Sequence, residues 1–224
     1  MRVKIDLRKF RETVLNQGTH AYAFTNDWFD VVKPVWEGLI PQIKPQRILE
    51  IGSYEGASAC YLIDRLTPDH AIEIHCVDTW TGGVEHLDGI TNMSEVEARF
   101  HANTALAIRN APSAVNLVVH KGLSDVCLAQ LVAQGHAETF DFIYVDGSHQ
   151  APDVLADAVL GFKLLRVGGV MIFDDYLWAE ELPLGRDPLR CPKIAVDAFV
   201  NCYFRKLQIL RAPLYQLYVQ KTSV

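Results

Sequence analysis

Short apolar runs alternate with helical segments along most of this chain, and this alternation limits the folds that are open to it. The runs "RILEI" (47–51) and "AIEIHCV" (71–77) flank the stretch "GASACYLIDRL", in which apolar residues recur at helical spacing. The pattern continues through "VNLVVH" (115–120), "DVCLAQLVAQ", "FDFIYV" (140–145), "DVLADAVLGFKLL" and "GGVMIF", which ends at Phe173. Apolar strands that alternate with helices predict a parallel sheet with helices on both faces.

The end of the chain departs from this alternation. After a helix predicted in "PKIAVDAFVNCYF", the runs "KLQIL" (206–210) and "LYQLYVQ" (214–220) are separated by only three residues. Three residues are too few for a crossover, so the two runs should pair as an antiparallel hairpin. The expected fold is therefore α/β, Rossmann-like and doubly wound, with a mostly parallel seven-stranded sheet that ends in an antiparallel hairpin. Gly168 and Gly169 fit the turn that follows a helix.

The length of 224 residues and the hydrophobic content of 50% suit a single domain over 1–224, although length alone leaves two small domains open. Residues 46–220 form the predicted core. Residues 1–45 predict two helices, the second with four large apolar residues at helical spacing, and 79–113 predicts a loop and a helix opened by a capping box at Ser94–Glu97. Both segments could cover a site, while ordinary core packing also explains the four apolar residues, Trp28, Phe29, Val32 and Trp36.

The charge balance and the cysteines exclude several classes of protein. Twenty-one basic and 27 acidic side chains give a net charge of −6 without blocks of like charge, which argues against nucleic acid or an anionic membrane as partner. We expect a small-molecule partner and a cytoplasmic location, because no signal-peptide core and no run of ~18 apolar residues is present. The five cysteines are odd in number and lack a C-x-x-C pair, so reduced thiols are expected.

A glycine-containing turn, "LEIGSYEG" (49–56), joins the first predicted strand to its helix. Gly52 and Gly56 permit a tight turn and close approach of a ligand to the helix N-terminus, although such turns also occur for structural reasons alone. Asp78 ends the second strand 22 residues after Gly56 (78 − 56), close to the spacing of a carboxylate that binds a ribose diol. A dinucleotide fingerprint would need glycine where Tyr54 stands, and Glu50 beside the turn suits a cation better than a phosphate.

These features resemble the class I S-adenosylmethionine-dependent methyltransferases over roughly 46–220. The shared pattern is E-x-G-x-x-x-G after strand one, an acid at the end of strand two and a terminal hairpin. The resemblance implies S-adenosylmethionine as cofactor and a last strand inserted antiparallel beside the fifth. It assigns Glu50 to the loop and the methionine end, the Gly52 backbone to the cofactor and Asp78 to the ribose. The other expected cofactor contacts are Ser53, Tyr54, Gly56, Ser58, Thr79, Trp80, Gly122, Ser124 and Asp146.

Within this resemblance, "HKGLSD" (120–125) approaches the adenine ring at the end of strand three. Ser124 is then a plausible adenine contact. It is equally credible as the N-cap of the helix that follows, and the two roles are compatible.

Three aspartates follow strands four and five of the predicted sheet. Asp146 ends the stretch "FDFIYVD", and Asp174 and Asp175 stand in "FDDY". Ligands of parallel sheets sit beyond the carboxyl ends of the strands, so these carboxylates should converge there. Carboxylates in one cleft repel one another unless a cation or protons separate them, and their hard oxygen atoms suit Mg²⁺ or a similar divalent ion. Each aspartate alone would be explained by a turn or a helix cap.

The arrangement also resembles the metal-dependent O-methyltransferases. Their sugar type, which acts on macrolide and aminocoumarin sugars, has an Asp-Asp pair after strand five as in "FDDY", whereas the catechol type has Asp-Asn, so the sugar type is favoured. The resemblance implies a hydroxylated small-molecule acceptor such as a sugar or natural product, and oligomers are common in similar enzymes. A metal would lower the pKa of the acceptor hydroxyl and direct its attack.

His149 stands three residues after Asp146 and is the favoured general base, since an unperturbed pKa near ~6.5 suits proton removal at neutral pH. Asp146 is the rival base, and a lone histidine before a helix is often only a capping or surface residue. Acceptor contacts are expected from the loop "DYLWAEELPLGRDPLRCPK" (175–193), because long loops often act as lids. The candidates are Tyr176, Trp178, Arg186 and Arg190.

Other functions remain open from the sequence. A metal-independent methyltransferase of the same fold would resist a chelator. A protein related to the hydroxylase-associated members of antibiotic pathways would add oxygen instead of a methyl group. A non-catalytic module would bind the cofactor without transfer, and a dinucleotide oxidoreductase is disfavoured by Tyr54.

Overall fold

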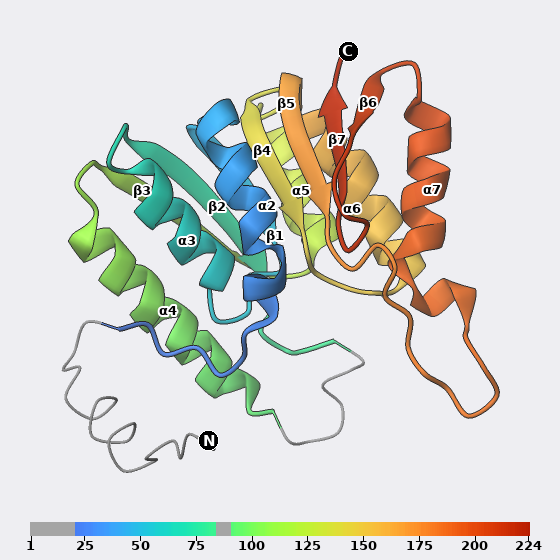
Figure 1. The fold of residues 1–224 in the computed structure, drawn as a ribbon, viewed down its shortest axis with the longest axis horizontal. Helices are drawn as coiled ribbons and strands as arrows, with labels where there is room; N and C mark the ends of the chain where they lie inside the picture. Colours follow the sequence, from blue (N-terminus) through green and yellow to red (C-terminus); the bar gives the residue numbers. More distant parts are fainter. Residues whose placement is uncertain (1–20, 84–90) are drawn as a thin grey trace, which may run out of the picture.

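One seven-stranded sheet organises residues 21–83 and 91–224, the parts of the chain that the computed structural model describes (Figure 1). The strand order is β3-β2-β1-β4-β5-β7-β6. The first five strands run parallel, whereas β7 is antiparallel to both β5 and β6, so the predicted fold and its terminal hairpin are confirmed. The strands are β1 (Arg47–Ile51), β2 (Ile72–Asp78), β3 (Val115–Lys121), β4 (Phe140–Val145), β5 (Leu165–Phe173), β6 (Leu207–Leu210) and β7 (Leu217–Lys221).

Helices cover both faces of the sheet (Figure 1). One layer contains α2 (Trp28–Ile43), α3 (Ala57–Leu66) and α4 (Met93–Asn110). The other layer contains α5 (Ser124–Ala133), α6 (Ala151–Leu164) and α7 (Pro192–Tyr203), and the short 3₁₀ helix η2 (Pro188–Arg190) precedes α7.

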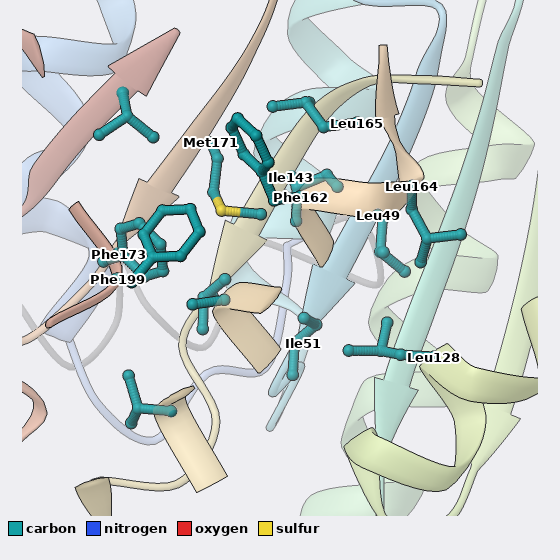
Figure 2. Close-up of a cluster of buried hydrophobic side chains, with 14 of the residues drawn as sticks. Leu49, Ile51, Leu128, Ile143, Phe162, Leu164, Leu165, Met171, Phe173 and Phe199 are labelled. Carbon is teal, nitrogen blue, oxygen red and sulfur yellow. The ribbon is translucent and has the colours of Figure 1, made fainter. Parts of the chain in front are cut away.

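The strands bury side chains on both faces, as the near-continuous apolar runs predict. In β1, Ile48 packs into the layer of α2, α3 and α4, while Leu49 and Ile51 pack into the opposite layer. Figure 2 shows this second core, in which Met171 of β5 lies near Phe162 of α6. Each fully buried side chain of this size contributes about 1.5–3 kcal/mol relative to an exposed one.

The helix predicted in the second half of 1–45 is present as α2, and its apolar residues are mainly core. Trp36 is fully buried, and its ring lies edge-on to Phe142 and Tyr144 at centroid distances of 5.2 and 4.8 Å. Its indole Nε1 donates to Gln216 Oε1 at 3.0 Å, which satisfies the buried polar atom. Trp28 differs, because it is 59% exposed. The other predicted helix falls on residues 1–20, outside the described residues.

Two predicted helix starts are wrong. Helix α4 is capped by Asn92 instead of Ser94, since the Asn92 side chain accepts from the Ser94 N–H at 3.2 Å and donates to Glu95 Oε1 at 3.0 Å. Asparagine is at least as good an N-cap as serine, and Asn92 with Glu95 repeats the capping pattern two residues earlier. Ser124 is the first residue of α5 and not its cap, because Leu123 occupies the N-cap position.

The Gly168–Gly169 pair lies within β5 and does not form the turn that was expected. Helix α6 passes directly into β5 at Leu165. Gly168 has φ +83°, and the register between β4 and β5 shifts between Phe140 and Phe142. The glycines therefore accommodate an irregularity in a central strand.

The cysteines agree with the expectation of reduced, mostly buried thiols. Cys60, Cys76 and Cys127 are buried, Cys191 is partly buried, Cys202 is exposed, and all five are free. Across 21–83 and 91–224, every helix is too short or too polar to cross a bilayer.

Candidate active site

The turn after β1 is shaped by contact with the end of β4. Gly52 has φ +82°, and a Cβ added there would lie 2.0 Å from the carbonyl oxygen of Asp146. The Asp146 N–H donates to the Ile51 carbonyl at 2.8 Å, which fixes the two strand ends together. Glycine is therefore required by the protein's own backbone, whereas the sequence suggested approach to a ligand.

Glu50 holds this turn from beneath. Its carboxylate is fully buried and accepts from Ser53 Oγ at 2.6 Å, from Ser58 Oγ and from Cys76 Sγ at 3.4 Å. Burial raises its pKa. The expected role in stabilising the loop agrees with this geometry, but a fully enclosed carboxylate does not face a methionine group. The Ser53 and Ser58 side chains are likewise turned inward, so only their backbone remains for a cofactor.

Asp78 ties three neighbouring loops together at the same edge of the sheet. One oxygen accepts from the N–H groups of Ser53 and Tyr54, both at 2.9 Å, and the other accepts from the Trp80 N–H at 2.7 Å. Its backbone carbonyl accepts from the Gly122 N–H at 3.0 Å, which joins the end of β3. Each carboxylate oxygen has two acceptor positions, so the oxygen that accepts from Trp80 has one position left for a ribose hydroxyl.

The Trp80 side chain supports the fold, and its assignment as a cofactor contact stays a prediction. It is 4% exposed, its Nε1 donates to the Tyr54 carbonyl at 2.9 Å, and its ring lies 4.9 Å from Phe100. It supports from below the turn of residues 52–56, which we call the cofactor loop. Thr79, partly exposed beside it, and Gly56, at φ +81° before α3, remain at the edge of the turn.

Opposite this loop, a histidine and an aspartate pair across the ends of β4 and β5. His149 Nε2 lies 2.8 Å from Asp175 Oδ2. The Trp178 ring stacks on the imidazole at a centroid distance of 4.2 Å and an angle of 23°. The tryptophan and the aspartate together fix the orientation of the imidazole.

The acids expected after β4 and β5 do lie close together. A cavity of about 10 Å³ is lined by Asp146, Asp174, Asp175 and His149, among other residues. Asp146 keeps some exposed surface but is closely surrounded by protein. Its pKa is raised well above the usual range, mainly by burial and next by the negative charges of Asp174 and Asp175. The pKa of Asp174 is raised by the same causes, burial and then Asp175.

The donor chemistry of this cluster fits a divalent cation. Carboxylates whose mutual repulsion raises their pKa values are stabilised when a cation neutralises them. In the present arrangement, however, Asp174 accepts from the Tyr144 hydroxyl and from Gln216 Nε2 at 3.0 Å, and Asp175 is turned to His149. Within the described residues, no three His, Cys, Asp or Glu side chains are already grouped as a metal centre.

The four residues expected to contact the acceptor have different positions. The Tyr176 side chain is buried, its hydroxyl donates to Asp197 Oδ1 at 2.7 Å and accepts from Lys193 Nζ at 3.0 Å, and its assignment as an acceptor contact stays a prediction. Arg190 pairs with Glu180 at 2.6 Å, and Arg186 is exposed. Trp178 stacks on His149, which lines the cavity together with the three acids.

Glu55 lies in this region but was not among the residues predicted from the sequence. It is 2% exposed and accepts from the Thr25 N–H at 2.6 Å, from Thr25 Oγ1 at 2.7 Å and from Arg99 Nε at 2.5 Å. It thus joins the segment before α2, the cofactor loop and α4. The available signal was an acid placed directly before Gly56 in an otherwise tight turn.

A family model described as a methyltransferase domain matches residues 49–176. This range holds the cofactor loop, Asp78, His149 and all three acids. The chain belongs to this methyltransferase family.

The relatives of this methyltransferase domain agree with the fold. This chain is 25% identical over 140 residues to a probable caffeoyl-CoA O-methyltransferase 3 of Dictyostelium discoideum. The match covers 62% of this chain and about half (47%) of that curated relative. The O-methyltransferase of Bacillus cereus, solved in complex with SAH, has a TM-score of 0.60 at 18% identity, with 98% of this chain and 93% of that one covered. TomG of Streptomyces achromogenes, solved in complex with SAM, has a TM-score of 0.59 at 20% identity, with 99% and 92% covered.

Proposed function

We propose that this chain is an S-adenosylmethionine-dependent O-methyltransferase that methylates a hydroxyl group of a small molecule. The observation that carries the proposal is the contact between Gly52 and the Asp146 backbone, because it brings the cofactor loop against the acid cluster and His149. The family membership and the activities for which the relatives are named support it.

The cofactor loop and Asp78 would bind the nucleoside part of the cofactor. The N–H groups of Ser53 and Tyr54 hold the loop at Asp78, and Asp78 has one acceptor position left for a ribose hydroxyl. The negative charge of Asp146, Asp174 and Asp175 would favour a positively charged sulfonium group near the end of β4.

His149 would accept the proton that the acceptor hydroxyl loses as its oxygen bonds to the methyl carbon. Asp175, 2.8 Å from His149 Nε2, would stabilise the imidazolium that results. Trp178 would restrict the imidazole to one orientation and exclude water from that face. Asp146 remains the rival base.

A divalent cation such as Mg²⁺ would be held by Asp146, Asp174 and Asp175. When bound, it would lower the pKa of the acceptor hydroxyl and orient it. We propose a sugar or natural-product hydroxyl as the acceptor, on the Asp-Asp pair after β5. The caffeoyl-CoA name of the curated relative makes a catechol-type hydroxyl the second acceptor class.

A second candidate function is methyl transfer without a metal. The His149–Asp175 hydrogen bond favours a metal-free reaction, because the Asp175 oxygen that holds His149 is not free to bind a cation. The bonds from Tyr144 and Gln216 to Asp174 favour it for the same reason.

The test incubates the protein with S-adenosylmethionine and a panel of hydroxylated sugars and catechols, with Mg²⁺ or with a chelator, and measures product mass. A product heavier by one methyl-for-hydrogen exchange is expected, with turnover lost in the chelator. Asp175→Ala should lower turnover at least about a hundredfold with little change in cofactor affinity, while Glu181→Ala, an exposed acid of the same loop, should match the wild type. Chelator-resistant turnover would select the metal-free candidate, and cofactor binding without any methylated product would refute both.

A further inference from the structure

Asp175 has a backbone conformation that residues with a β-carbon seldom adopt. Its φ is +53°, in the left-handed region, where such a residue is strained. A strained conformation persists only where the surrounding structure holds it, and such positions cluster at functional sites. Asp175 is also the residue whose Oδ2 lies 2.8 Å from His149 Nε2. The contacts that hold Asp175 therefore decide whether this pair forms.

Asp175 begins a tight turn that brings two side chains to His149. The Trp178 N–H donates to the Asp175 carbonyl at 2.8 Å, which closes the turn over 175–178. The Asp175 carboxylate then bonds to the imidazole nitrogen, and the Trp178 ring stacks on the imidazole face at a centroid distance of 4.2 Å. Because both contacts depend on the same turn, a shift of the turn would displace both.

Tyr176, the second residue of this turn, is fixed through its backbone and through its side chain. Its N–H donates to the Tyr215 carbonyl at 3.0 Å, and its ring is 9% exposed within the core that includes side chains of α6 and α7. Its hydroxyl donates to Asp197 Oδ1 at 2.7 Å and accepts from Lys193 Nζ at 3.0 Å. We call the two hydroxyl bonds to these α7 residues the α7 anchor.

The α7 anchor matches the hydrogen-bonding capacity of a phenol. Lys193 and Asp197 lie one helical turn apart and form an ion pair with each other. The hydroxyl has one hydrogen for the carboxylate and a lone pair for the ammonium, and bonds to charged partners are the stronger kind. The Lys193 ammonium also lies 4.8 Å from the centroid of the Tyr176 ring. Helix α7 therefore holds the turn that carries Asp175 and Trp178.

We propose that Tyr176 is a positioning residue: through the α7 anchor it fixes the Asp175 hydrogen bond and the Trp178 stack on His149. The inference deepens the proposed function and rests on it, since His149 acts there as the base. It assigns a role in the reaction to two residues of α7 that lie outside the lining of the cavity around the acid cluster.

The first test follows the Trp178 stack by NMR, without added cation, at about pH 9, where the imidazole of histidine is uncharged. The ring current of a stacked indole displaces the Cε1–H signal of His149, and His149→Gln identifies that signal. Tyr176→Phe and Asp197→Ala should each move it toward the position of an unstacked histidine, because each removes part of the anchor. Asp197→Asn keeps an oxygen that can accept from the Tyr176 hydroxyl, so it should restore the wild-type position.

The second test separates kcat from KM in methyl transfer. Tyr176→Phe and Asp197→Ala should lower kcat about tenfold, because the base is misplaced. The KM for the acceptor and the affinity for S-adenosylhomocysteine should change less than about twofold, since neither variant removes a ligand contact. Asp197→Asn should rescue kcat, and the double variant Tyr176→Phe/Asp197→Ala should lose no more than either single variant.

Tyr203→Phe is the matched control, because it removes a tyrosine hydroxyl from the same helix while its ring keeps its packing against Phe199 at 4.7 Å. It should match the wild type in both tests. An unmoved His149 signal in Tyr176→Phe and Asp197→Ala would overturn the inference. A raised KM with unchanged kcat would overturn it as well, since Tyr176 would then be an acceptor contact.

Two further outcomes are separable from these. If Tyr176→Phe does not fold, the comparison of Asp197→Ala with Asp197→Asn decides in its place. A wild type that forms no methylated product would refute the proposed function, whereas the NMR comparison would still decide whether the α7 anchor fixes the Trp178 stack.

Discussion

The α-carbon of Gly52 faces the carbonyl oxygen of Asp146 so closely that a β-carbon there would lie 2.0 Å from it. The end of β1 and the end of β4 therefore form one unit, further joined by the Asp146 N–H to Ile51 carbonyl bond of 2.8 Å. Because the cofactor loop follows one strand and the acid cluster begins at the other, a shift of either one displaces both.

Gly52→Ala should destabilise the protein by about 3 kcal/mol or more, since it adds a steric clash with backbone to an unfavourable positive φ. Gly135→Ala is the matched control: Gly135 also has a positive φ, +90°, but nothing lies within 4 Å of its added Cβ. It should cost only about 1–2 kcal/mol. Urea unfolding of both variants measures the difference, and equal losses would show that the clash is relieved by movement of the backbone.

Asp146→Asn should stabilise the cation-free protein at pH 7. The raised pKa of Asp146 means that the folded state binds more protons than the unfolded state above about pH 4, so stability falls as the pH rises through that value. Neutralising the side chain removes this loss, and the difference from wild type should vanish below about pH 4.

Thermal unfolding of this variant across the pH range checks the sign. Asp30→Asn on the exposed side of α2 serves as the control and should change little. Added Mg²⁺ should raise the melting temperature of the wild type more than that of Asp146→Asn, if the proposed cation binds there. A variant that is less stable than wild type at pH 7 would mean that Asp146 makes a favourable interaction outweighing the repulsion.

Low pH should reduce the free energy of unfolding through His75 of β2 and His120 of β3, which lie on adjacent strands. Burial lowers the pKa of His75 and of His120, whose rings hydrogen-bond at 2.9 Å, and Glu73 accepts from His75 at 3.0 Å. The Arg47 guanidinium contacts both Glu73 Oε1 and His136 Nδ1, at 2.7 Å each. Glu73 and Arg47 are therefore charged groups beside the two histidines.

Because the folded pKa values of His75 and His120 are depressed, the unfolded chain takes up protons first as the pH falls below about 6.5. The two histidines should therefore contribute a decrease in stability from pH 7 to pH 5, and His75→Gln should remove part of this contribution. His101→Gln, an exposed histidine of α4, should leave it unchanged. Urea unfolding at several pH values gives the slope, and a slope that is identical in His75→Gln would contradict the assignment.

Glu55→Ala should release the segment before α2 from the cofactor loop. The variant loses both bonds to Thr25 and leaves Arg99 without its buried partner, so we expect a loss of about 3 kcal/mol. Limited proteolysis should then cleave within 21–27 faster than in wild type. Glu37→Ala, an exposed acid of α2, should behave as wild type. Unchanged cleavage would show that other contacts hold the segment.

The periodicity of the sequence was sufficient for the fold, because each strand and helix carries its own burial pattern. The hairpin followed from three intervening residues, since no crossover fits that length. The helix starts were harder to predict: Ser94 and Asn92 are both good caps, and each has a glutamate three residues later, so the local pattern fits both.

The candidate site was predicted in outline only. The sequence marked Asp78, Asp146, Asp174 and Asp175 by their positions at strand ends, and parallel topology brings such ends to one edge. It could not show that the Tyr176 side chain turns to Asp197, because that depends on the packing of α7 against the loop.

By itself, then, the sequence determined the doubly wound sheet and the edge at which polar groups collect, since both follow from local periodicity and chain direction. Only the tertiary structure decided what each polar side chain does there. Glu50 turns inward to two serines, Asp175 meets His149, and the Tyr176 hydroxyl donates to Asp197. These choices depend on contacts between residues far apart in the chain, which no local pattern encodes.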